Sequence, residues 1–136
     1  MNIPLQFTWR FDQIPSIESL EQRSSLSKEL LIEHLDQPVA PFVVTLPMYV
    51  AETIQRPFPG GTILSFLQFL YDVYQEPMPA EECIPILNYP QIHVVERFRT
   101  YIDQAHQGIF APRNTMLYPN TILTRIRRNK LVIDWD

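Results

Sequence analysis

The chain has 136 residues and a formal net charge of −4, so it is long enough for one domain with a hydrophobic core and too short for two. Its negative charge argues against a general binder of polyanions but leaves room for a local basic patch. The single cysteine, Cys83, excludes an internal disulfide, and no apolar run reaches the roughly 18 residues of a membrane helix. Because the start of the sequence lacks a basic and apolar leader, we expect one soluble, intracellular domain over residues 1–136.

The first part of the chain predicts short strands and helices in alternation. Apolar and polar residues alternate over 5–9, which indicates a half-buried strand. Ser16 is placed to cap a turn of helix, and leucines at helical spacing predict a longer helix over 25–35. The β-branched run 42–46 predicts a buried strand, and residues 49–54 predict a second strand that pairs with it.

Residues 62–75 give the strongest helix signal in the chain. Gly60 and Gly61 precede this segment and Pro77 follows it, so backbone chemistry sets its limits. The polar residues after Thr62 recur at intervals of three, four and three, which places them on one line of a helix. These polar residues are Ser65, Gln68, Asp72 and Gln75. Since the rest of the helix is apolar, it must be covered on more than one side, either by its own chain or by a partner.

The second half of the chain completes an α+β pattern. An amphipathic helix is predicted over 91–107, and two β-type runs at 122–126 and 131–135 predict a C-terminal hairpin. We therefore expect a small, mostly antiparallel sheet with two main helices, 62–75 and 91–107, packed on one face and the earlier helix at an edge.

The order of these elements resembles an uncharacterised small α+β domain that is common in fungi and occurs in some large DNA viruses. The resemblance spans residues 35–133 and rests on the proline-bounded strand 42–46 and on the block 62–71, which reads Thr-Ile-Leu-Ser-Phe-Leu-Gln-Phe-Leu-Tyr. The corresponding helix of that domain has the form Thr-Val-x-Asp-Val-Leu-x-x-Leu-Tyr, and this chain has Leu64-Ser65-Phe66 where the pattern has x-Asp-Val. The resemblance implies no catalytic residue, and it favours a non-enzymatic module.

The apolar helix and the lack of converging catalytic groups predict a non-catalytic protein–protein interaction or assembly module, not an enzyme. Its partner would be another protein or a second copy of the chain. We expect that partner to contact exposed aromatic side chains, because such rings favour the centres of interfaces. The interface candidates are Phe58, Tyr71, Tyr74, Tyr89 and Tyr118. No cofactor and no membrane contact are predicted.

A basic cluster in the predicted hairpin supports an alternative, nucleic-acid binding. Its members are Arg125, Arg127, Arg128 and Lys130. Such a hairpin tip could contact phosphates, as ribbon-type nucleic-acid binders do. The same charges could instead be a solvated sheet edge that prevents aggregation.

A third possibility is a small cysteine-dependent hydrolase or transferase that pairs Cys83 with His93 or His106. Cys83 lies directly after two glutamates, which would raise the pKa of its thiol, so a role as a small hydrophobic residue is favoured. His93 and Glu96 have a spacing that can present two metal ligands on a helix. No other segment supplies further ligands, so no metal site is predicted.

Overall fold

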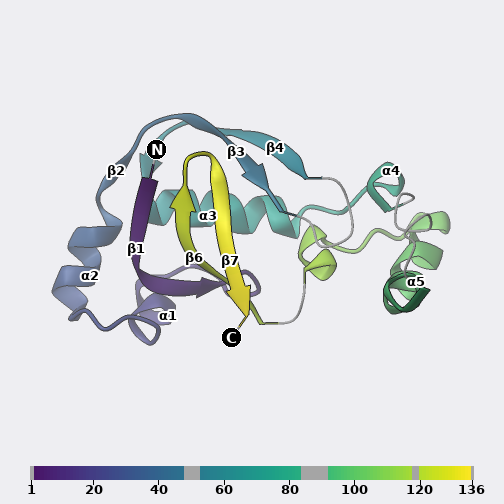
Figure 1. The fold of residues 1–136 in the computed structure, drawn as a ribbon, viewed down its shortest axis with the longest axis horizontal. Coiled ribbons are helices and arrows are strands. Elements are labelled where there is room, and N and C mark those ends of the chain that lie inside the picture. Colours follow the sequence, from purple (N-terminus) through teal and green to yellow (C-terminus); the bar gives the residue numbers. More distant parts are fainter. Residues whose placement is uncertain (1, 48–52, 84–91, 118–119, 136) are drawn as a thin grey trace.

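The structure is a computed structural model that describes residues 2–47, 53–83, 92–117 and 120–135. Helices and a mixed sheet confirm the predicted α+β fold (Figure 1). In chain order the elements are β1 (Asn2–Arg10), α1 (Ile17–Glu21), α2 (Lys28–Leu35), β2 (Pro38–Val39), β3 (Phe42–Leu46), β4 (Ile54–Phe58), β5 (Gly61–Thr62), α3 (Ile63–Gln75), α4 (Ala80–Cys83), α5 (Ile92–His106), the 3-10 helix η2 (Arg113–Met116), β6 (Thr121–Arg127) and β7 (Lys130–Trp135).

The main sheet has the strand order β1-β6-β7-β3-β4. Neighbouring strands are antiparallel except for β3 and β7, which run parallel with Thr45 opposite Lys130. Strands β6 and β7 form the predicted C-terminal hairpin, and the pair Arg127 and Lys130 closes its turn. The last two strands of the domain therefore lie in the middle of the sheet. Strands β2 and β5 form a separate two-stranded sheet.

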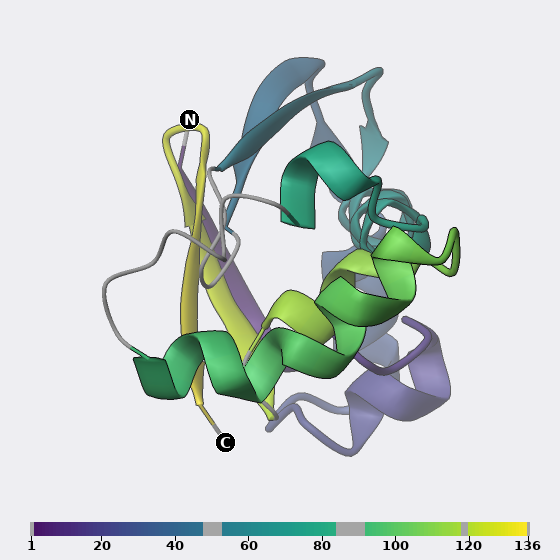
Figure 2. The same ribbon diagram turned by 90° about the vertical axis from the view of Figure 1, so that its right-hand side faces the viewer.

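Helix α3 lies across one face of the main sheet, and the helix predicted over 62–75 is confirmed (Figures 1 and 2). It begins where Thr62 and Ser65 cap each other. The Thr62 hydroxyl accepts from the Ser65 N–H at 3.2 Å, and the Ser65 hydroxyl accepts from the Thr62 N–H at 2.7 Å. Its buried residues are Ile63, Phe66, Leu67, Leu70, Val73 and Tyr74. Because α1 and α2 lie on the same side of the sheet, the domain's own elements cover much of this helix (Figure 2).

Helix α5 occupies the end of the domain. It lies past the end of α3, next to α4, and not directly over the strands (Figure 1). Its inward residues Phe98, Ile102 and Ala105 are buried in the same hydrophobic core as α3. The segment predicted as a helix over 91–107 is therefore helical, and it closes one end of the core.

The second strand of the predicted pair lies further along the chain than 49–54. The structure describes only residues 53 and 54 of that segment, of which Ile54 alone is in a strand, and β4 continues to Phe58. Pro57 is tolerated because β4 is an edge strand, where a missing N–H breaks no bond of the sheet. Phe58 fixes the strand by packing on Phe66, with ring centroids 5.0 Å apart.

The two ends of the part of the chain that contains α4 and α5 are joined to each other. A β-bridge joins Pro77 to Pro112, and the N–H of Met78 donates to the carbonyl of Ala111 at 2.8 Å. The N–H of Arg113 also donates to the carbonyl of Glu76 at 3.1 Å. Backbone hydrogen bonds thus hold the end of α3 next to the start of η2.

Candidate functional site

The main sheet has an outer face that none of α1, α2 and α3 covers (Figure 2). In the hairpin, Arg127 pairs with Lys130 and Arg125 pairs with Val132. Paired residues of antiparallel strands point to the same face, so these side chains lie together. The residues that alternate with them, including Ile126, are buried, which places the three cations on the outer face.

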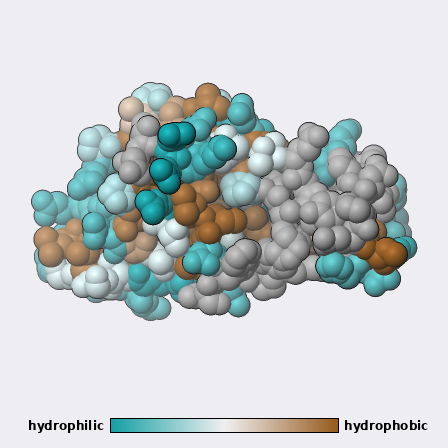
Figure 3. All heavy atoms as spheres, in the orientation of Figure 1, coloured by the Kyte–Doolittle hydropathy of each residue, from teal (hydrophilic) through white to brown (hydrophobic). Residues whose placement is uncertain are grey.

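Four cations therefore gather on the hairpin, and we call this set the basic face. Its members are Arg125, Arg127, Arg128 and Lys130, and all four are exposed. Figure 3 shows strongly hydrophilic side chains near the hairpin tip and an apolar patch below them on the same face. Within the described ranges, no ion pair engages any member of the basic face, whereas Arg10, for example, is paired with Asp12 at 2.7 Å. The part of the chain that the structure describes therefore does not neutralise the positive charge of the hairpin.

Two hollows lie against the hairpin. The first hollow, of about 390 Å³, is lined by Arg127, Arg128, Lys130, Leu131 and Val132. The second hollow, of about 200 Å³, is lined by Thr45, Pro47, Thr53, Lys130 and Leu131. Lys130 and Leu131 line both hollows, so the two adjoin. The lining residues within the described ranges include no aromatic side chain.

The turn of the hairpin holds Arg128 in an unfavourable backbone conformation. Its φ is 61°, in the left-handed region that costs a residue other than glycine about 1–2 kcal/mol. The next residue, Asn129, accepts a hydrogen bond from the N–H of Thr45 at 2.8 Å through its carbonyl, which fixes the turn to β3. An arginine stands where glycine would fit without strain. Such strain at an exposed cation is typical of residues kept for a function.

The aromatic interface candidates are mostly not on the surface. Phe58 is 3% exposed and Tyr74 is 0% exposed, so the expectation that these two rings face a partner is wrong. Both residues are buried because β4 and α3 turn them into the core. Tyr71 is half-buried at the edge of the core. Tyr89 and Tyr118 lie outside the described residues.

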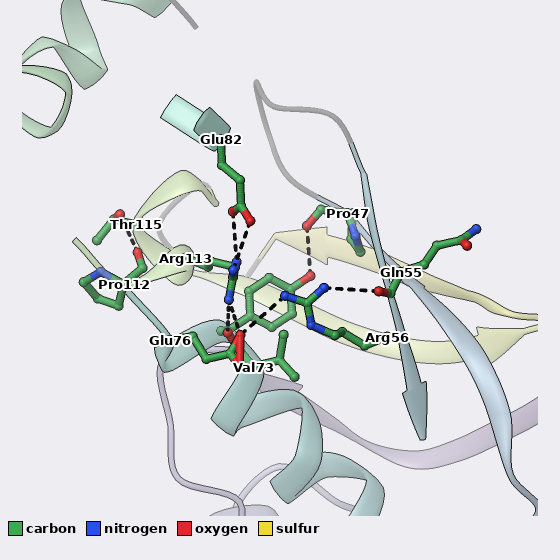
Figure 4. A network of polar contacts seen from close by, with 10 residues as sticks. Pro47, Gln55, Arg56, Val73, Glu76, Glu82, Pro112, Arg113 and Thr115 are labelled. Atoms are coloured by element: carbon green, nitrogen blue, oxygen red, sulfur yellow. Dashed lines mark hydrogen bonds and ion pairs between the residues drawn. The ribbon is translucent and has the colours of Figure 1, made fainter. Parts of the chain in front are cut away.

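Sequence reasoning missed a buried ionic network around Arg113, which is 4% exposed (Figure 4). Its Nε and Nη2 donate to the two carboxylate oxygens of Glu82, each at 3.0 Å, and its Nη1 donates to Glu76 and to the carbonyl of Val73. Hydrogen bonds to Glu82 hold the pKa of Arg113 above its ordinary value, although burial opposes this. Both carboxylates are engaged by a cation, so the network ties segments together and positions no general base.

The residues proposed for cysteine chemistry gain no support from the described geometry. His93 and His106 are exposed on α5, and the side chain of Cys83 lies outside the described part. Glu96, the other metal-ligand candidate, is exposed beside His93. Among the residues that the structure describes, no group of three or more His, Cys, Asp or Glu could hold a metal ion.

No helix in the described ranges is both long and apolar enough to span a membrane. Comparisons of this chain with models of known protein families, with curated proteins and with solved structures found no match. The resemblance to a fungal and viral domain thus stays a prediction, and function must be argued from the geometry of the basic face.

Proposed function

We propose that this protein is a non-catalytic binding module that holds the phosphate backbone of a nucleic acid against its basic face. One observation carries the proposal: four exposed cations share one helix-free region of the sheet, without ion pairs from the described residues. Unpaired Arg and Lys side chains bind phosphates and release the counterions that surround them.

The overall acidity of the chain supports an oriented mode of binding. Four of the eleven Lys and Arg residues lie within the six positions 125–130, while the chain as a whole has a net charge of −4. A polyanion is therefore attracted to the hairpin and repelled by most of the remaining surface. This resolves the conflict between an acidic composition and a polyanionic ligand.

The chemistry of the basic face favours backbone recognition over base recognition. Among the described residues that line its two hollows there is no aromatic ring on which a base could stack. We therefore expect binding to depend weakly on sequence and strongly on salt.

The experiment is a salt titration of binding to a short, labelled, single-stranded oligonucleotide and to its duplex. If all four cations contact phosphates, the slope of log affinity against log salt is about −3 to −4. The double variant Arg125→Gln/Arg127→Gln should flatten this slope by about 1.5 to 2. A matched control, Lys28→Gln/Arg99→Gln, removes the same charge from exposed positions on α2 and α5 and should leave the slope close to that of the parent. The proposal would be refuted if the slope flattened equally in both variants, or if the parent protein did not bind the oligonucleotide at low salt.

As a second candidate function, we propose assembly with a second copy of the chain. The surface that favours it is not α3 but two apolar residues that follow α5. Ile109 and Phe110 follow α5 and are 56% and 41% exposed. Adjacent exposed apolar residues are typical of contact surfaces. Light scattering after size exclusion should then show a dimer that Ile109→Ser/Phe110→Ser dissociates. The control Ile14→Ser/Leu30→Ser changes two exposed apolar residues elsewhere and should keep the dimer, whereas a monomeric parent protein would exclude this candidate.

A further inference from the structure

The two hollows beside the hairpin form one continuous surface with two different chemistries. Lys130 and Leu131 line both, so a ligand that occupies the first hollow reaches the second by crossing Lys130. The first hollow has Arg127 and Arg128 in addition to Lys130. Among its described lining residues, the second hollow has no other cation, and it presents Thr45 and Thr53 instead.

The second hollow suits a neutral group that carries hydroxyls. No hydrogen bond in the described part of the chain engages the hydroxyl of Thr45 or Thr53, so each is available to a ligand. Leu131 and Pro47 add apolar walls. A volume of about 200 Å³ corresponds to roughly six or seven water molecules in the liquid, which is room for a sugar ring.

The side of the second hollow that Thr45 and Pro47 form is fixed before any ligand arrives. Thr45 lies in β3, paired with Gln55 of β4, and its N–H donates to the carbonyl of Asn129 at 2.8 Å. The carbonyl of Pro47 accepts from the hydroxyl of Tyr74 at 2.8 Å (Figure 4). Burial raises the pKa of Tyr74 well above its ordinary value, so this hydroxyl remains a donor. A preformed wall lowers the entropy lost on binding.

We propose that the second hollow is a sugar subsite, which holds the ribose or deoxyribose next to a phosphate bound by Arg127, Arg128 and Lys130. The proposal rests on the proposed function and names its ligand more closely. The ligand is a sugar–phosphate polymer, recognised through its sugars as well as its charge, and not a polyanion of any kind.

The test compares three polymers on one set of variants: an oligonucleotide, inorganic polyphosphate, which has no sugars, and a sulfated polysaccharide, whose sugars carry different anions. Thr45→Val/Thr53→Val removes both hydroxyls and keeps the branched shape. Two lost hydrogen bonds should weaken oligonucleotide binding about tenfold. Polyphosphate and polysaccharide binding should change by less than twofold. Arg127→Gln/Arg128→Gln should weaken binding of all three.

Conservative variants show whether weaker binding comes from lost hydrogen bonds or from a protein that no longer folds. Thr45→Ser/Thr53→Ser keeps both hydroxyls and should bind the oligonucleotide nearly as well as the parent. Thr53→Val alone changes a residue outside the strands and should cost roughly threefold in affinity. The subsite is refuted if the valine variants bind the oligonucleotide as tightly as the parent. It is also refuted if they lose as much affinity for polyphosphate or polysaccharide as for the oligonucleotide. In both cases the basic face stands. If the parent binds none of the polymers, the basic face fails as well, and the subsite with it.

Discussion

The imidazole of His34 accepts a hydrogen bond from the backbone N–H of Gln6, with 3.2 Å between Nε2 and the amide nitrogen. His34 lies in the last turn of α2 and is 7% exposed, and its ring meets the edge of Phe7 at a centroid distance of 5.7 Å. This bond fastens α2 to the outer edge of β1. An acceptor nitrogen must be unprotonated, and burial lowers the pKa of His34 below its ordinary value.

The first prediction is that His34 makes stability fall in weak acid. Above the unfolded-state pKa of about 6.5, His34 is neutral in both states and folding is unaffected. As the pH falls below this value, the unfolded chain takes up a proton that the folded protein resists, so stability decreases by at most about 1.4 kcal/mol per pH unit. Urea unfolding of the parent and His34→Gln between about pH 8 and 5 measures this loss. His34→Gln should flatten the curve, and His93→Gln, an exposed control, should not.

The second prediction concerns the Arg113 network. Replacement of Arg113 by Gln should lower the free energy of unfolding by about 2–3 kcal/mol, less than for a fully enclosed pair because Glu76 and Glu82 can still reach water. Hydrogen exchange should also quicken across residues 79–110, whose base the network holds. Arg10→Gln breaks an exposed pair and should cost less than about 1 kcal/mol. If the two variants lost the same free energy of unfolding, burial of Arg113 would add nothing to the stability that its ion pairs provide.

The third prediction separates stability from binding at the hairpin turn. Arg128→Gly relieves a positive φ, so it should raise the free energy of unfolding by roughly 0.5–1 kcal/mol while weakening oligonucleotide binding. Asn129→Gly is the control: its φ is not positive, so glycine there should not stabilise the protein. Chemical denaturation and binding titrations of both variants measure the two effects. An unchanged affinity in Arg128→Gly would argue that the strained arginine serves no phosphate contact.

The fourth prediction tests α3 as a core element. Leu70 is 0% exposed, and Leu70→Ala should cost about 2–5 kcal/mol through the cavity that it leaves. Tyr74→Ala should be at least as severe, because Tyr74 is also completely buried. Tyr71 is half-buried, so Tyr71→Ala should cost much less. Thermal melts rank the three variants, and a Tyr71→Ala variant as unstable as Leu70→Ala would contradict the boundary between core and surface that the structure places at Tyr71.

Local patterns predicted the elements well where backbone chemistry sets their ends. The helix over 62–75 was readable because Gly60 and Gly61 precede it and Pro77 follows it. The C-terminal hairpin was readable from two β-type runs separated by a polar turn. Both signals depend on neighbours in the sequence, so no tertiary information was needed.

Features that depend on distant partners were not predictable from one sequence. Tyr74 borders the polar line of α3, and only the position of Pro47, 27 residues earlier, shows that its hydroxyl is bonded inside the protein. Arg113 is similar, because its partner Glu82 lies 31 residues away. For the basic face, the sequence supplied the residues, but not the finding that no carboxylate in the described ranges forms an ion pair with them.

The strand order decides when the domain can form during synthesis. The central strands β6 and β7 separate β1 from β3, and they are translated after all the others. Until residues 121–135 are made, β1 has no strand beside it, and the Trp9 side chain has no sheet to enclose it. The sheet therefore cannot be completed before residues 121–135 are made, and a nascent chain stalled before residue 121 displays an unpaired edge and apolar side chains, the features that chaperones bind.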